Sequence, residues 1–209
     1  MRLSADHRRR SFWLKHLHRW HWISAALSLV GMILFAATGI TLNHAGEIEA
    51  TPRMTTVEKR LPAPLLTSLA AAAEGPPRRS LPPGAADWLA SELGVRAAGR
   101  EAEWSADEIY LALPRPGGDG WVSIDLGDGA VRHEVTDRGW VSYLNDLHKG
   151  RNAGIAWGWF LDVFAAACLV FCITGLVLLK LHAGGRPATW PVVGFGLVAP
   201  MLLALLFIH

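Results

Sequence analysis

The chain has 209 residues, of which 51% are hydrophobic and 18% are charged, and its formal net charge at pH 7 is +2. This composition is richer in apolar residues than that of a typical soluble domain, so part of the chain is expected to lie in a lipid bilayer. Because the net charge is small and the basic residues crowd at the N-terminus, we expect no nucleic-acid partner.

Residues 1–21 form a basic N-terminal segment, and residues 22–42 form the first expected transmembrane helix. The second of these ranges is uncharged and long enough to cross a hydrocarbon core of roughly 30 Å. Since lysine and arginine collect on the cytoplasmic side of membrane proteins, the basic segment predicts that the N-terminus lies in the cytoplasm.

The stretch RRSFWLK, at residues 9–15, resembles a twin-arginine export signal, which would make the first span a cleaved leader. Three features argue against cleavage. The stretch HLHRWH separates the motif from the apolar core, no A-x-A site follows the span, and two further spans remain. We therefore interpret 22–42 as a retained membrane helix.

Residues 43–155 are expected to form a small periplasmic domain between the first two membrane helices. PAPLLTSLAAAAE and AADWLASELG are helical patterns, and Gly94 ends the second. EIYLALP, GWVSIDLG and AVRHEVT are strand-like runs separated by turn residues, which predicts an antiparallel sheet packed on a helix. GWVSYLNDLHKG then predicts an amphipathic helix on the membrane surface.

Residues 156–179 and 191–208 are the second and third expected membrane helices, and residues 180–190 form a cytoplasmic loop between them. Cys168 and Cys172 lie four positions apart, on one face of the second helix, where they suit packing and not a disulfide. The expected fold class is a mainly α membrane protein of three transmembrane helices, with a small α+β domain inserted between helices 1 and 2.

Asp162 is the only acidic residue inside an expected span. A carboxylate within a membrane is a functional candidate by default. Asp162 is expected to orient a ligand histidine or carry a proton, or else to pair with Arg151 or a hydroxyl such as that of Thr41.

Six of the nine histidines flank the first two spans, and we group them by depth. The outer group is His44 and His148, and the inner group is His16, His18, His21 and His182. Two neutral imidazoles on facing helices provide the two axial nitrogens of a six-coordinate haem b. The alternative is that each is a half-solvated residue near the headgroups. The other three histidines are expected at the surface: His7, His133 and His209. His209 is also considered as a spare ligand.

The first two spans also resemble each other. LHR (17–19) and LHK (147–149) open them, and FAATGI (35–40) and FCITGL (171–176) lead towards their ends. Because the two helices run in opposite directions, these motifs suggest an inverted repeat with equivalent histidines at both faces.

These residues resemble the PepSY-associated transmembrane proteins of bacterial inner membranes. LHRWHW before a span with TGI, and LHKGR before a span with TGL, are similar to the paired helices of that family, and WVSIDLGDGAV is similar to the closing hairpin of a PepSY domain. The resemblance covers nearly the whole chain. It implies an inner-membrane location.

Larger members of the family are similar to haem-containing reductases of iron-siderophores, so the resemblance implies a membrane electron carrier. It supports His44 and His148 as outer ligands and His18 and His182 as inner ligands of haem b, with His16 and His21 as alternatives to His18. The larger reductases have more spans, which suggests that this chain is one subunit of a system.

We therefore expect an oxidoreductase component that uses haem b to pass electrons to a periplasmic or membrane redox partner, such as a ferric-siderophore reductase system. His18 and His44 are 26 residues apart, or roughly 39 Å along a helix, which is too far for one electron hop. The alternative is a membrane-anchored PepSY module that binds a periplasmic protein without a cofactor. A third hypothesis is that the histidines bind a metal ion or carry protons. The sequence contains no hydrolase motif.

Overall fold

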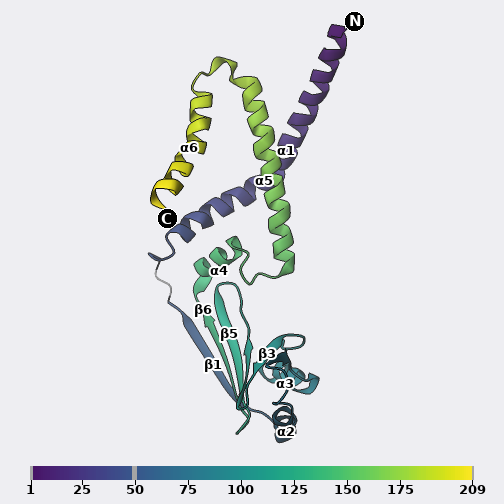
Figure 1. Cartoon of the computed structure of the whole chain (residues 1–209), viewed down its shortest axis with the longest axis vertical. Coiled ribbons are helices and arrows are strands. Elements are labelled where there is room, and N and C mark those ends of the chain that lie inside the picture. Colours follow the sequence, from purple (N-terminus) through teal and green to yellow (C-terminus); the bar gives the residue numbers. More distant parts are fainter. Residues whose placement is uncertain (1, 49–50, 209) are drawn as a thin grey trace. The chain divides into compact units, whose positions relative to one another are not determined.

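The structure is a computed structural model that describes residues 2–48 and 51–208, with side chains from residue 8 onward. His209 and the side chain of His7 therefore lie outside the described part. The chain divides into two compact units, whose elements Figure 1 follows along the sequence. We call residues 1–34 and 160–209 the helical unit, and residues 35–159 the sheet unit.

Three helices are long and apolar enough to cross a membrane: α1 (Arg2–Asn43), α5 (Ile155–His182) and α6 (Thr189–Phe207). A short 3-10 turn, η1 (Ala183–Gly185), lies between the last two. Most of their large apolar side chains are exposed, as expected for helices whose surroundings are lipid. The expected three spans are confirmed, and the chain is a membrane protein.

Helix α1 extends through the basic segment that the sequence suggested as a separate N-terminal region. No glycine precedes Gly31 and no proline precedes Pro52, so no strong helix breaker interrupts this stretch. Gly31 itself is required by packing, because a Cβ at this position would overlap the ring of Phe164 in α5. In the helical unit, α1 and α5 therefore approach each other closely at this glycine.

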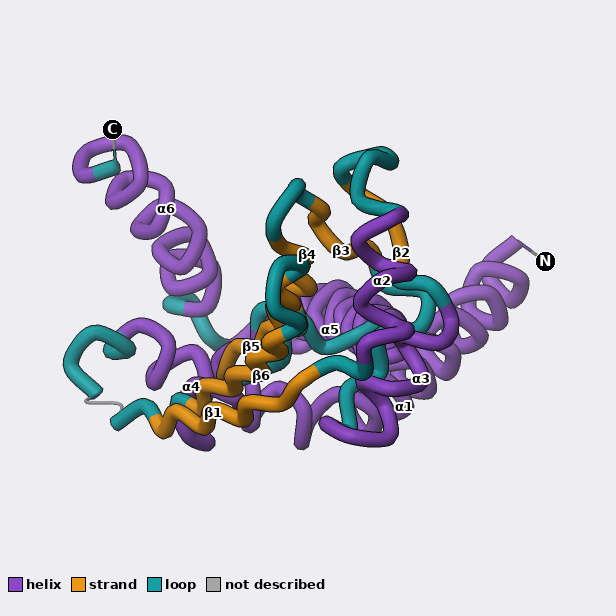
Figure 2. The backbone as a smooth tube through the Cα atoms, turned by 90° about the horizontal axis from the view of Figure 1, so that it is seen from below, coloured by secondary structure: helices purple, strands orange, loops and turns teal. Residues whose placement is uncertain are grey.

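The sheet unit contains six antiparallel strands in the order β1-β6-β5-β4-β3-β2, which Figure 2 shows side by side. The strands are β1 (Arg53–Arg60), β2 (Arg78–Ser80), β3 (Glu101–Trp104), β4 (Glu108–Ala112), β5 (Gly118–Asp125) and β6 (Ala130–Asp137). The helices α2 (Ala63–Ala71) and α3 (Pro83–Leu93) pack on the sheet and bury a core around Leu69, Leu89, Ile109, Val122 and Val131.

The predicted antiparallel sheet with packed helices is confirmed, although three of its strands were not predicted. β4, β5 and β6 correspond to the three predicted runs, and Gly94 ends α3 in the left-handed conformation with φ = 67°. β1 escaped prediction because all eight of its residues are exposed, so it has no buried, alternating apolar face. Its strand conformation comes from pairing with β6, from Arg53 opposite Asp137 to Arg60 opposite Ala130.

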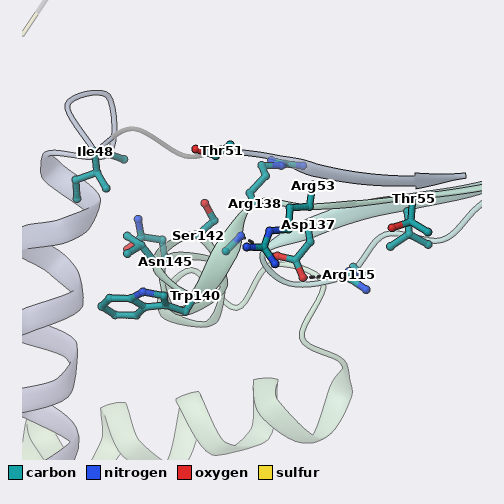
Figure 3. Close-up of a pocket in the computed structure, with 14 residues that line it drawn as sticks. Ile48, Thr51, Arg53, Thr55, Arg115, Asp137, Arg138, Trp140, Ser142 and Asn145 are labelled. Carbon is teal, nitrogen blue, oxygen red and sulfur yellow. Dashed lines mark hydrogen bonds and ion pairs between the residues drawn. The ribbon is translucent and has the colours of Figure 1, made fainter.

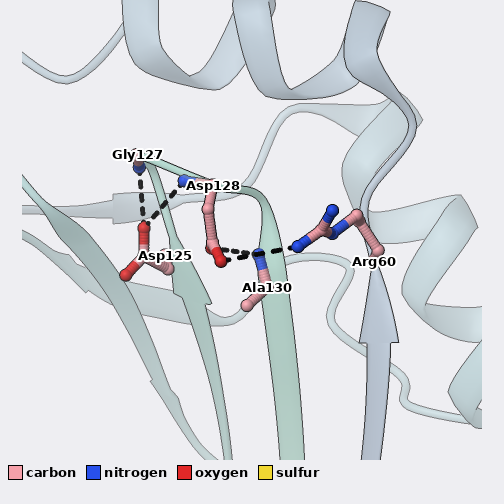
Figure 4. A network of polar contacts seen from close by, with 5 residues as sticks. All are labelled: Arg60, Asp125, Gly127, Asp128 and Ala130. Atoms are coloured by element: carbon pink, nitrogen blue, oxygen red, sulfur yellow. Dashed lines mark hydrogen bonds and ion pairs between the residues drawn. The ribbon is translucent and has the colours of Figure 1, made fainter.

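The β5–β6 hairpin is closed by the two aspartates of the sequence IDLGDGA (Figure 4). Asp125 Oδ1 accepts the backbone N–H groups of Gly127 (2.7 Å) and Asp128 (3.0 Å). Asp128 Oδ1 accepts the N–H of Ala130 at 2.8 Å, and its other oxygen lies 3.6 Å from an Nη of Arg60 in β1. Side-chain oxygens thus accept the N–H groups of Gly127, Asp128 and Ala130 in this turn.

Candidate functional site: two histidine modules

His148 ends the helix α4 (Gly139–His148) and contacts the end of α1 within the sheet unit. The hydroxyl of Thr38 donates its proton to the carbonyl oxygen of Phe35 at 3.2 Å, so we assign its oxygen as the acceptor for the Nδ1–H of His148 at 2.7 Å. Nε2 then carries the lone pair that can bind a metal. The imidazole also packs on Phe35, with ring centres 4.9 Å apart.

His21 has a matching environment within the helical unit. The hydroxyl of Thr174 in α5 donates to the carbonyl oxygen of Val170 at 2.6 Å, so it accepts the Nδ1–H of His21 at 3.0 Å. The His21 ring stacks on Phe171, with centres 4.8 Å apart and planes 17° apart. His21 is therefore also held through Nδ1, which leaves Nε2 as the nitrogen that could bind a metal.

A glycine completes each set. A Cβ on Gly39 would lie 3.7 Å from Cε1 of His148, and a Cβ on Gly175 would lie 3.3 Å from Cε1 of His21. At Gly175 the absence of a side chain gives the His21 imidazole room, whereas a Cβ on Gly39 would make only an ordinary contact with His148. We call these groups the His148 module (Phe35, Thr38, Gly39 and His148) and the His21 module (Phe171, Thr174, Gly175 and His21).

The two modules give the internal repeat a physical meaning. Each Phe-x-x-Thr-Gly motif packs against a histidine from the other half of the repeat. The motifs LHR and LHK would make His18 the equivalent of His148, whereas the packing makes His21 the equivalent. The signal that could have identified the module residues, the repeated F-x-x-T-G, was present in the sequence, but their roles were not recognised.

His18 and His182 form a different pair in the helical unit. Their ring centres are 6.1 Å apart, with planes at 89°. The Nδ1 of each ring lies 2.8 Å from the carbonyl oxygen four residues earlier in its own helix, Leu14 for one and Leu178 for the other. Because a carbonyl only accepts, Nδ1 carries a proton in both residues, and Nε2 makes no hydrogen bond with a described residue.

The remaining candidate histidines do not form such pairs among the described residues. His44 follows α1 and lies 3.2 Å from Glu47 Oε2, and no hydrogen bond or ring contact joins it to His148. His16 bonds through Nδ1 to the carbonyl oxygen of Phe12 at 3.0 Å.

Asp162 is exposed, and its side chain has no hydrogen bond or ion pair with any residue that the structure describes. The partners considered for it are engaged by α4 instead. Thr41 donates to Asn145 Oδ1 at 2.8 Å, and Arg151 Nε lies 3.8 Å from Asp146 Oδ1.

Helix α4 connects the His148 module to the sheet. Asp146 is 8% exposed, and its Oδ2 accepts the N–H of Gly117 in the β4–β5 turn at 2.8 Å. Gly117 has φ = 71°, and a Cβ there would press on the backbone of Tyr143, so the turn and α4 fit closely. The Trp157 indole also donates to the carbonyl oxygen of Leu147 at 2.9 Å.

Within the described part of the chain, no three His, Cys, Asp or Glu side chains lie together as a metal-binding group. A protein-only cage such as a structural zinc site is therefore not formed by these residues. Axial ligation of haem needs only two imidazoles, so the lack of a three-residue group among the described residues does not argue against a histidine pair as haem ligands.

Comparisons with known proteins agree with the resemblance seen in the sequence. No curated protein and no solved structure matches the chain. A model of the PepSY_TM-like family matches residues 12–209, which include all three membrane helices, the sheet and both histidine modules. The chain belongs to this PepSY-associated transmembrane family.

Proposed function

We propose that this protein is an inner-membrane electron-transfer protein that binds haem b through its membrane histidines. The observation that carries the proposal is the proximity of His18 and His182, whose ring centres lie 6.1 Å apart and whose Nδ1 atoms are both bonded to main-chain carbonyls. Two imidazoles on opposite sides of one metal, with bonds of about 2 Å each, have ring centres about 6 Å apart. The observed separation of 6.1 Å fits this requirement.

The protonation of the other nitrogen supports ligation as well. Metal-binding histidines almost always donate their second ring N–H to a fixed acceptor, which sets the tautomer and the orientation of the ring. Main-chain carbonyls do this for His18 and His182, and threonine hydroxyls do it for His21 and His148. In all four residues Nδ1 is engaged, which leaves Nε2 as the nitrogen that would bind iron.

We assign the haem to His182 with His18, keeping His21 and His16 as alternatives to His18, and we keep His148 with His44 as the outer ligand pair that the sequence predicts. Bound haem b supplies a one-electron couple. The main-chain carbonyls and threonine hydroxyls bonded to Nδ1 would orient these imidazoles toward the iron. With the N-terminus in the cytoplasm, the chain would pass electrons from a quinol or cytoplasmic donor to a periplasmic redox partner, and the sheet unit would lie in the periplasm.

The test is a reduced-minus-oxidised absorption spectrum of the full chain, purified in detergent from haem-replete cells. We expect sharp b-type bands that weaken in His148→Ala and in His182→Ala. Comparison of His18→Ala, His21→Ala, His16→Ala and His44→Ala then assigns the second ligands. His133→Ala is the matched control, because this histidine lies in β6 and should leave the spectrum unchanged.

A colourless protein would overturn the proposal and favour a second candidate, a membrane-anchored module that binds a periplasmic peptide or protein. β1 supports this alternative, since it is an edge strand of eight exposed residues that pairs only with β6. An edge strand of this kind can accept a further strand from a partner.

A further inference from the structure

A pocket of about 980 Å³ opens in the sheet unit where the chain leaves α1, and Figure 3 shows the residues around it. The start of β1, the end of β6 and the start of α4 form its walls. Its charged lining residues are three arginines, Arg53, Arg115 and Arg138, and one carboxylate, Asp137. The lining thus carries an excess of positive charge.

The one carboxylate is already engaged. Asp137 Oδ2 accepts from Arg115 Nη2 at 2.9 Å, and its Oδ1 accepts the N–H of Gly139 at 2.7 Å. The Nε of Arg115 is buried and has no hydrogen-bond partner in the structure. The guanidinium groups of Arg53 and Arg138 make no hydrogen bond or ion pair with another described residue. Three arginines therefore retain donors for a ligand.

The residues around the pocket are of the kind found at membrane–water interfaces. Ala45 lines it, only two residues after the apolar helix α1 ends at Asn43. Trp140, another lining residue, is 71% exposed, and tryptophan is the residue that collects at the headgroup level of membranes. Guanidinium groups bind phosphate oxygens in paired hydrogen bonds, and basic pockets beside membrane helices bind anionic headgroups.

We propose that this pocket binds the phosphate group of an anionic phospholipid, held by Arg53, Arg115 and Arg138. The acyl chains would lie along the apolar, exposed surface of the adjoining part of α1. This inference is independent of the haem proposal, because no histidine takes part in it.

The test uses the full-length protein in detergent and counts bound phosphatidylglycerol by native mass spectrometry, with phosphatidylcholine as the comparison lipid. We expect the wild type to retain phosphatidylglycerol selectively. The double variant Arg53→Gln/Arg138→Gln should bind it roughly thirtyfold more weakly, from the usual contribution of two basic residues at an anionic surface. The matched control is Arg96→Gln/Arg100→Gln, which removes the same charge from two exposed arginines outside the pocket.

Three results would overturn the proposal. One is an equal loss of phosphatidylglycerol binding in the control variant, which would show that the overall charge of the protein attracts the lipid. Another is undiminished binding in the pocket variant when circular dichroism shows that it is folded. The third is displacement of the lipid by millimolar inorganic phosphate, with binding of phosphate alone through the same arginines, which would identify a soluble anion as the ligand.

Discussion

The His148 and His21 modules have the same composition but different supports. His21 lies within the continuous helix α1 and depends only on packing between membrane helices. His148 ends the short helix α4, which is fixed to the sheet through Asp146 and to α1 through Asn145. The same local chemistry is thus achieved once by helix packing and once by docking of a folded domain. Perturbing the sheet should distinguish the two.

The largest effect is expected from Leu89→Ala in the core of the sheet unit. Leu89 is fully buried, so the cavity should cost about 2–5 kcal/mol of the free energy of unfolding. Hydrogen–deuterium exchange should quicken in β4–β6 and α4 but not around Thr174. Met54→Ala, at an exposed position on β1, is the control and should change little. Equal loosening of both modules would contradict the comparison.

Asp146→Ala should have the next largest effect, about 1–3 kcal/mol, because it leaves the N–H of Gly117 without its acceptor. Exchange should increase in α4 and the β4–β5 turn. Asp146→Asn retains an oxygen that can accept the bond and should recover most of the loss. If the alanine and asparagine variants behave alike, the hydrogen bond to Gly117 is not what fixes α4.

Removing one threonine hydroxyl should affect only its own module. Thr38→Val and Thr174→Val keep the side-chain shape but remove the acceptor for Nδ1–H, at an expected cost of about 0.5–1.5 kcal/mol each. Nitrogen NMR of labelled histidines should show a mixed tautomer at His148 in the first variant and at His21 in the second. Thr67→Val, at an exposed position of α2, is the control. A change at both histidines in either variant would show that the modules are coupled.

The smallest expected effect is a pH dependence of the stability of the sheet unit. Partial burial lowers the pKa of His133 below its ordinary value of 6.5. The unfolded chain therefore binds a proton more readily than the folded one, so stability falls as the pH drops through 6.5 and is restored above it. In thermal unfolding between pH 7.5 and 5.5, His133→Gln should reduce the fall of the unfolding temperature with decreasing pH. An unchanged slope would exclude His133 as its source.

The sequence predicted those parts of the fold whose residues carry their own pattern. β4 could be found because buried Ile109 and Leu111 alternate with exposed residues, and α3 because Gly94 ends it. β1 has no such pattern and exists because β6 pairs with it.

The sequence grouped His18 with His182, whose rings the structure places 6.1 Å apart, but it did not predict the contacts of His21 with Thr174 and of His148 with Thr38. α1 continues unbroken through His21 into the membrane span, whereas α4 ends at His148 and a loop precedes α5. The number of residues between the histidine and the start of the membrane span therefore differs between His21 and His148. An alignment of short motifs cannot account for this difference, which depends on how α4 docks.

Because each histidine module combines residues from both halves of the repeat, the two modules can form only in a fixed order during synthesis. The chain emerges from the ribosome N-terminus first. The His148 module draws its last residue from position 148, whereas the His21 module waits for Thr174 and Gly175. The earlier histidine is thus the later one to find its threonine. A ribosome stalled between residues 150 and 170 would carry a nascent chain in which the first membrane helix still lacks the partner that fixes its imidazole.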